Sequence, residues 1–191
     1  MGPAAGTQTS VGESVRAARE QRGLTLEQTA ELSGLSKSHL SRIESSERQP
    51  SVAALLSLSE ALGAPVSELF GERAGSAAIA VSSPDDPRWE SNGLRIASCS
   101  GFGGSSVIEA LRLTVPPDRV PPAATRHHGE ELLYVVAGTV HLEYDGEVHS
   151  LESGTTAHIN AELPHRLRAV GGPAEVLLVA AKPARNVQTI H

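Results

Sequence analysis

The residues best suited to bind a ligand or a metal ion are two histidines and one glutamate in the second half of the chain. His127 and Glu131 are four residues apart, so on an extended strand they point to the same face. That face carries apolar neighbours, as does the face of His165. An unpaired carboxylate in an apolar interior is costly, so we expect a metal ion, a bound ligand or a protonated histidine beside Glu131.

A second polar group, in the first half of the chain, has the residue types and spacing to contact DNA. In the segment 37–44, Leu40 and Ile43 take one side, which leaves the polar side chains on the other. An arginine can bond a guanine edge with two hydrogen bonds, while serine and lysine reach bases or phosphates. The expected DNA contacts, with those of the flanking segments, are Thr25, Gln28, Ser36, Lys37, Ser38, His39, Ser41, Arg42 and Arg48.

Helices are expected to position the DNA-contacting residues. Ser10 with Glu13 and Thr25 with Gln28 have the spacing of capping boxes, and Gly34 supplies a turn before the next helix. The caps and stops predict five short helices over residues 10–22, 26–33, 37–44, 51–62 and 65–70. Five short helices in about sixty residues form a compact bundle.

Strands are expected to position the histidines and the glutamate. From residue 93 onward apolar residues alternate with polar ones, and glycine and proline become frequent. Asp145-Gly146 is a strong hairpin signal between two alternating segments. Seven or eight such segments at regular spacing predict a sandwich or barrel.

Size and composition allow two small domains. The chain has 191 residues, a formal net charge of −6 and one cysteine, so no disulfide can form within it. No apolar run is long enough to span a membrane, and the N-terminus does not resemble a signal peptide, so we expect a cytoplasmic protein with no membrane partner. The predicted divisions are a disordered N-terminus 1–9, a helical DNA-binding domain 10–72, a linker 73–93, a barrel 94–185 and a tail 186–191.

The helical half resembles the helix-turn-helix of the phage-repressor or XRE family. The resemblance covers about residues 11–70 and rests on GLSKSHLSRIE, the following QPS, then ALG and a final phenylalanine. It implies sequence-specific binding of a double-stranded DNA operator, usually by a homodimer.

The strand-rich half resembles the cupin superfamily, whose fold is a double-stranded β-helix, or jelly-roll. The resemblance rests on RHHGEELLYVVAG, Gly154 and the Pro164-His165 pair. His127, Glu131 and His165 match positions that bind the metal in cupins with a divalent ion, but Thr125 stands where those cupins have a further histidine. The implied alternatives are one Fe, Zn, Ni or Mn ion, or a metal-free pocket in which Glu131 bonds to His127 or to a backbone amide.

Two functions follow from these resemblances. The first is a transcription regulator without catalytic residues, whose barrel binds a small-molecule effector through polar groups such as Arg112 and Tyr134. The alternative is a mononuclear non-haem iron enzyme, similar to the cupin epoxidases and oxygenases, that uses His127, Glu131 and His165. The intact LSRIE and QPS segments favour the DNA-binding function.

Overall fold

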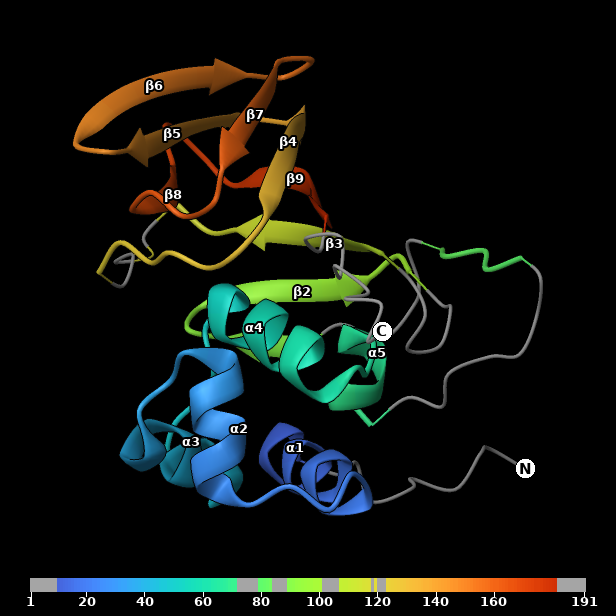
Figure 1. Cartoon of the computed structure of the whole chain (residues 1–191). Helices are drawn as coiled ribbons and strands as arrows, with labels where there is room; N and C mark the ends of the chain where they lie inside the picture. The colour runs from blue at the N-terminus through green and yellow to red at the C-terminus, as the bar shows by residue number, and fades with distance from the viewer. Residues whose placement is uncertain are drawn as a thin grey trace, which may run out of the picture.

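The structure is a computed structural model that describes residues 10–71, 79–83, 89–100, 107–117, 119 and 123–181. The termini expected at 1–9 and 186–191 lie outside these residues, as does most of the predicted linker. The described chain forms a helical unit followed by a strand-rich unit, as the sequence predicts (Figure 1). None of the described helices has the length and the apolar run that a membrane crossing requires.

The helical unit begins each of its first four helices at a capping side chain. Ser10, Thr25, Ser36 and Ser51 each accept a backbone N–H of the first turn, which satisfies a donor that the helix leaves unpaired. Gly34 has a φ of 68°, a left-handed conformation that lets the chain turn sharply between the second and third helices. The helices are α1 (Val11–Gln21), α2 (Leu26–Ser33), α3 (Lys37–Glu44), α4 (Val52–Leu62) and α5 (Val66–Leu69).

The strands form two antiparallel sheets, consistent with the predicted cupin jelly-roll. The strand order is β1-β2-β3-β9-β4-β7 in the larger sheet and β6-β5-β8 in the smaller one. Leu111, Leu133, Val140 and Val176 are buried in the apolar core. The strands are β1 (Trp89–Ser91), β2 (Leu94–Ser98), β3 (Ile108–Val115), β4 (Glu130–Ala137), β5 (Thr139–Tyr144), β6 (Glu147–Glu152), β7 (Thr156–Asn160), β8 (His165–Ala169) and β9 (Ala174–Ala181).

The turn between β5 and β6 follows the sequence prediction. Asp145 and Gly146 have φ values of 49° and 87°, which suits a two-residue hairpin. The strand β1, by contrast, lies inside the range 73–93 that the sequence pattern assigns to a linker, and it pairs with β2. The first strand of the larger sheet therefore begins before the alternating pattern of the sequence does.

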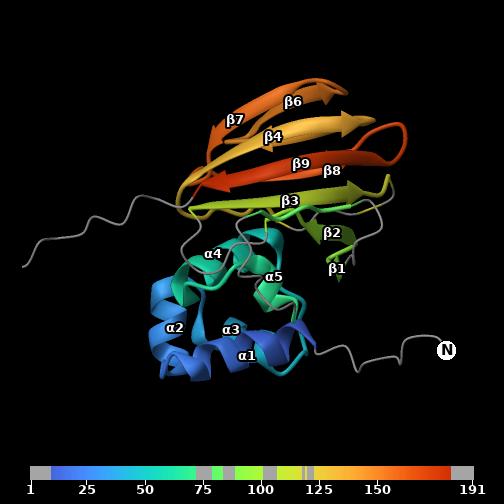
Figure 2. The ribbon, with the colours of Figure 1, turned by 90° about the vertical axis from the view of Figure 1, so that its right-hand side faces the viewer.

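The two units pack directly on each other. Figures 1 and 2 show α4 and α5 next to the sheet end formed by β1, β2 and β3. The rings of Phe70, at the end of α5, and Trp89, in β1, are stacked with centroids 4.1 Å apart. The buried carboxylate of Glu109 on β3 accepts hydrogen bonds from the Ser59 hydroxyl and the Val66 backbone N–H. Apolar and polar contacts thus join the helices to the barrel.

Candidate functional site: a buried His-Glu-His cluster and an exposed helix

The structure brings His127, Glu131 and His165 together in the barrel. His127 lies just before β4, Glu131 on β4 and His165 at the start of β8, and all three side chains are buried. The Nε2 atom of His127 lies 2.8 Å from Glu131 Oε1, and Nε2 of His165 lies 3.5 Å from Oε2. One donor atom from each residue lies within 4.8 Å of the others, so the three could share one metal ion. Two imidazoles and a carboxylate suit first-row transition metals.

Both histidines are oriented through their second ring nitrogen. Nδ1 of His127 lies 3.0 Å from the His128 carbonyl oxygen, and Nδ1 of His165 lies 2.9 Å from that of Leu163. An Nδ1–H that donates to a backbone carbonyl leaves Nε2 directed at the cluster, as is usual for metal-binding histidines. The donor set therefore fits a divalent ion.

Without an ion, charge pairing can stabilise the same cluster. Burial lowers the pKa of His127, but the hydrogen bond that the ring donates to Glu131, the negative charge of Glu131 and the hydrogen bond to the His128 carbonyl together raise the pKa above its ordinary value. In His127 both ring nitrogens face oxygen atoms, which favours the protonated ring. This is the protonated-histidine alternative that the sequence leaves open.

The neighbouring positions supply no further imidazole. Thr125 takes the place of the additional cupin histidine and pairs with His165 only through backbone hydrogen bonds. The His128 side chain is 76% exposed and lies 3.4 Å from Glu162, so it points away from the cluster, as its strand parity predicts. The described part of the cluster therefore offers three strong ligands.

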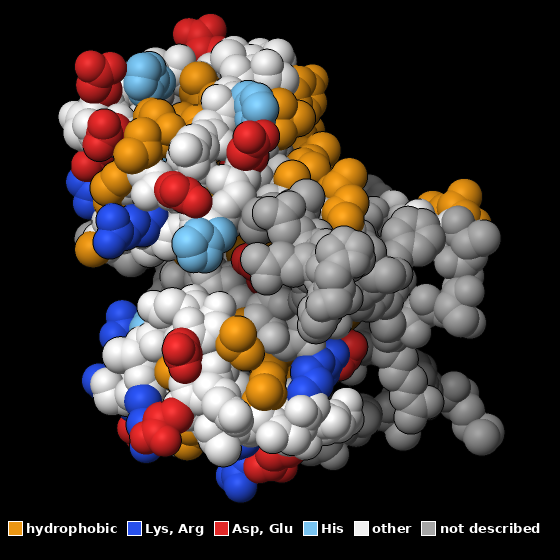
Figure 3. Space-filling model, viewed as in Figure 1, with side chains coloured by type: hydrophobic (Ala, Val, Ile, Leu, Met, Phe, Trp, Pro, Cys, Tyr) orange, Lys and Arg blue, Asp and Glu red, His pale blue; other side chains and the backbone are white. Residues whose placement is uncertain are grey.

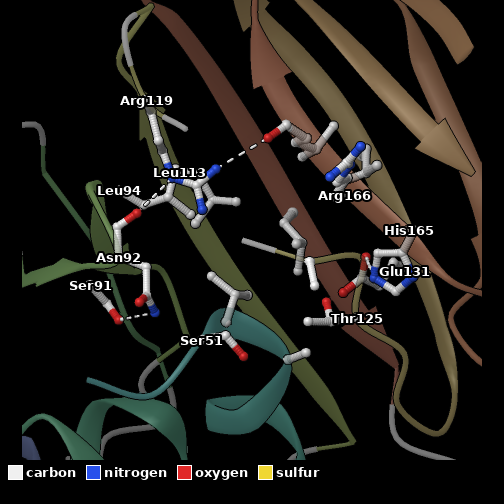
Figure 4. A pocket seen from close by; sticks show the side chains of 16 residues that line it. Ser51, Ser91, Asn92, Leu94, Leu113, Arg119, Thr125, Glu131, His165 and Arg166 are labelled. Atoms are coloured by element: carbon white, nitrogen blue, oxygen red, sulfur yellow. Dashed lines mark hydrogen bonds and ion pairs between the residues drawn. The ribbon is translucent and has the colours of Figure 1, made fainter. Parts of the chain in front are cut away.

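A cavity of about 70 Å³ adjoins the cluster (Figure 4). Glu131 and His165 line one side, and residues of α4 and of the β1–β2 turn line others. Arg112 and Tyr134, the expected effector contacts, are not among the lining residues: Arg112 donates to the Ser83 carbonyl, and Tyr134 is exposed. Both follow buried residues directly in their strands, so alternation turns them to the opposite face.

The second candidate site is the exposed face of α3. Leu40 and Ile43 are the buried residues of this helix, and four of the expected contacts around them are exposed. Those exposed side chains are Lys37, Ser38, Ser41 and Arg42. Thr25, Gln28 and Arg48, in the segments that flank α3 in sequence, are exposed as well.

Some of these residues already have partners in the chain. The ammonium of Lys37 pairs with Glu27, and Thr25 and Gln28 form the capping box of α2. His39 is half-buried against a cleft of about 500 Å³ between the two units, and its Nε2 atom has no hydrogen-bond partner. His39 therefore faces the barrel more than the exposed side of α3.

An ion pair between distant segments positions α3. Arg19 on α1 donates two hydrogen bonds of 2.6 and 2.9 Å to Glu44, the last residue of α3, and both side chains are largely buried. The Glu44 carboxylate raises the pKa of Arg19 above its ordinary value. At Gly12 a Cβ atom would lie 2.3 Å from the Ile43 carbonyl oxygen, so a glycine allows α1 to approach α3.

Several residues that shape these sites were not expected from the sequence. Arg119 and Asn92 line the cavity from turns, where no periodicity indicates which way a side chain points. Glu109 has the same strand parity as buried Leu111, and this parity is the signal that could have identified it as buried. Arg19 and Glu44 are 25 residues apart, and only the fold brings them together.

Comparison with known proteins assigns the two units to families. A helix-turn-helix family model matches residues 15–69, and a cupin-domain family model matches residues 111–180. The chain therefore has an XRE-type helix-turn-helix domain followed by a cupin domain.

Transcription regulators are similar to this chain across both units. The HTH-type transcriptional regulator PuuR of Escherichia coli is 27% identical over 156 residues, which cover 81% of this chain and 84% of PuuR. A solved structure of a helix-turn-helix family transcriptional regulator from Vibrio cholerae has a TM-score of 0.66 and 25% identity, and the match covers 91% of this chain and 95% of that one. The chain is thus homologous to transcription regulators along most of its length.

An enzyme fold is also similar, but more distantly. Hydroxypropylphosphonic acid epoxidase from S. wedmorenis, in complex with fosfomycin, has a TM-score of 0.49 and 20% identity, over 92% of this chain and all of that chain.

Proposed function

We propose that this protein is a transcription regulator that binds a specific DNA site through α3 and a small-molecule effector in its cupin barrel. The observation that carries the proposal is the exposed polar face of α3 within a complete, well-capped helix-turn-helix. Similarity to regulators over most of the chain supports it. No catalytic residue is assigned.

The exposed residues of α3 suit the major groove. In a helix-turn-helix the second helix of the motif enters this groove and presents its N-terminal residues to base edges. We assign Arg42 to a guanine edge, with Lys37, Ser38 and Ser41 reaching bases or nearby phosphates. Arg48, Thr25 and Gln28, in the flanking segments, would bond to phosphates and fix the register of the helix.

A homodimer is part of this proposal, because two recognition helices read two half-sites about 34 Å apart, one turn of DNA. The outward side chains of β4 offer a contact surface for a second copy: Leu132, Tyr134 and Val136 are 41%, 39% and 43% exposed. Figure 3 shows apolar side chains gathered along one flank of the barrel unit. We expect Leu132→Glu to give a monomer in light scattering and Val148→Glu, on the other sheet, to remain dimeric; an unchanged Leu132→Glu dimer would exclude this surface.

The experiment that tests the regulator function is selection of binding sites from random duplex DNA by the full chain. The expected result is one enriched sequence with two related half-sites a helical turn apart. Failure to enrich any sequence over the starting library, with folded protein, would contradict the proposal. DNA binding would also place the protein in the cytoplasm, with the chromosome.

A second candidate function, a mononuclear non-haem iron oxygenase or epoxidase, rests on the His127, Glu131 and His165 cluster. Iron held there would supply oxygen chemistry, while the three residues would leave positions open for substrate. The deciding measurement is metal per protomer in untagged protein purified without chelator, compared with His165→Ala. About one iron lost in the variant, together with oxygen uptake, would favour the enzyme; zinc, nickel, manganese or no metal would favour the regulator.

A further inference from the structure

The cavity beside the histidine cluster belongs to both units of the molecule. Ser51, Val52 and Ala53, at the start of α4, line it together with residues of the barrel and of the β1–β2 turn. Figure 4 shows the beginning of α4 below the cavity and the strands around it. A molecule bound there would therefore touch the helical unit and the barrel at the same time.

The two sides of the cavity differ in charge. Arg119 lies on one side, and Glu131 and His165 lie on the opposite side (Figure 4). The wall between them is apolar and is formed by Leu94, Leu113, Leu133 and Leu178. A ligand that fits has a short apolar body and a polar group at the end nearest Arg119.

The charge of Arg119 is not neutralised by any carboxylate in the described part of the chain. Its Nε donates to the Asn92 carbonyl at 2.7 Å and its Nη1 to the Leu167 carbonyl at 3.2 Å. Partial burial lowers the pKa of Arg119, since the surroundings solvate its charge less well than water does. The other arginine at the cavity, Arg166, is neutralised by Glu143 at 2.6 Å.

We propose that this cavity binds a small organic carboxylate, with the carboxylate on Arg119 and a short alkyl body against the leucines. The proposal rests on the proposed function, because it names the chemical class of the effector. An arginine fork is the donor group best matched to a carboxylate. The volume of about 70 Å³ is several times the roughly 10–15 Å³ that one water needs, so the ligand has only a few heavy atoms.

Arg119 also connects the cavity to the DNA-binding unit. The Asn92 carbonyl accepts a hydrogen bond from Arg119. Asn92 also bonds to the loop that follows α3: its backbone N–H donates to the Gln49 side chain, and its side-chain amide donates to the Pro50 carbonyl. The Ser91 hydroxyl donates to the same Pro50 carbonyl. A carboxylate that takes hydrogen bonds from Arg119 competes with Asn92, and Asn92 holds the loop that follows α3. Carboxylate binding and DNA binding are therefore coupled, and linkage makes the coupling reciprocal.

The binding test compares probes of one size and different charge on the full chain. Calorimetric titrations use butanoate, butylamine and butanol with wild type, Arg119→Gln and Arg119→Lys. Arg168→Gln is the matched control, because Arg168 lies on β8 next to Leu167 but its side chain is exposed and bonds to His141. We expect butanoate to bind most tightly and Arg119→Gln to weaken it by about ten- to a hundredfold, the range of a lost charge-assisted hydrogen bond. The butanoate affinity of Arg119→Lys should lie between those of wild type and Arg119→Gln, and the affinity of Arg168→Gln should match that of wild type.

The possible results distinguish a failure of the proposed carboxylate site from a failure of the proposed regulator function. Tighter binding of butylamine than butanoate, or equal butanoate binding by Arg119→Gln and wild type, would overturn the carboxylate site. Selective butanoate binding by a protein that enriches no DNA sequence would keep the site and reject the regulator. A shift of about fivefold or more in the affinity for selected DNA on adding butanoate, absent in Arg119→Gln, would support the coupling. A smaller shift, or none, with saturating butanoate would overturn it.

Discussion

The helices α3 and α4 follow each other in one helical unit, yet they meet their surroundings in opposite ways. α3 buries two of its eight residues and leaves the side chains of Lys37, Ser38, Ser41 and Arg42 exposed. α4 buries seven of its 11 residues, because it lies between the other helices and the barrel. A helix that is apolar on most sides is a core helix, whereas one with a single apolar stripe keeps a free face.

This difference separates two tasks within a small domain. α3 is held from one side only, by its apolar residues and by the Arg19–Glu44 pair, so its outer face is available to DNA. α4 lines the cavity with its first turn and packs its buried leucines into the apolar core. Mutations in α4 should therefore affect folding, and mutations on α3 should affect recognition.

The largest expected effect is on stability, in α4. Leu58 is fully buried, and Leu58→Ala should lower the free energy of unfolding by about 2–5 kcal/mol, through lost apolar contact and a residual cavity. Urea unfolding measures the loss. Leu32→Ala on α2, where the side chain is 58% exposed, is the control and should change stability little. Equal losses in both variants would contradict the core position of α4.

A smaller effect is expected where the barrel bonds to the helices. Glu109→Gln keeps the size of the side chain but removes the charge that accepts hydrogen bonds from Ser59 and Val66. The loss should be about 1–3 kcal/mol, the range for leaving buried partners poorly satisfied. Thermal unfolding followed by near-UV circular dichroism of Trp89 would report it, since Trp89 stacks on Phe70 between the units. Glu147→Gln, on exposed β6, should leave the transition unchanged.

The smallest effect is expected at the start of α3. The Ser36 side chain accepts the His39 backbone N–H at 3.2 Å, so Ser36→Ala should cost about 0.5–2 kcal/mol. Urea unfolding measures the stability of this variant and of Ser41→Ala, which changes an exposed position within the same helix. The difference between the two variants gives the contribution of the cap. Similar stability of the two variants would mean that tertiary contacts, and not the cap, hold the first turn of α3.

Local patterns predicted much of this architecture. The caps at Ser10 and Thr25 marked helix starts, because capping depends on a few neighbouring residues. Strand parity placed His127 and Glu131 on one face, the cupin resemblance added His165, and in the structure the three side chains lie together. Both kinds of pattern depend on residues close together in the sequence, so they can be recognised without knowledge of the fold.

The cavity could not be predicted in the same way. Arg119 and Asn92 reach it from turns, and the start of α4 reaches it from the other domain. Tyr134 was expected at the effector site although it lies between buried Leu133 and Val135, whose parity turns it outward. Chemical type alone, without parity, thus does not indicate on which face of a strand a side chain lies.

The most direct test of the account is the affinity of wild type, Arg42→Ala and Arg16→Ala for the selected duplex and for a scrambled duplex at one salt concentration. Arg16 is an exposed arginine on α1, paired with Glu20, and serves as the control. We expect Arg42→Ala to lose about 1–3 kcal/mol of binding free energy on the selected duplex and much less on the scrambled one. The affinities of Arg16→Ala should resemble those of wild type. Equal preference for the selected duplex in wild type and Arg42→Ala would contradict the assignment of α3 as the helix that reads DNA.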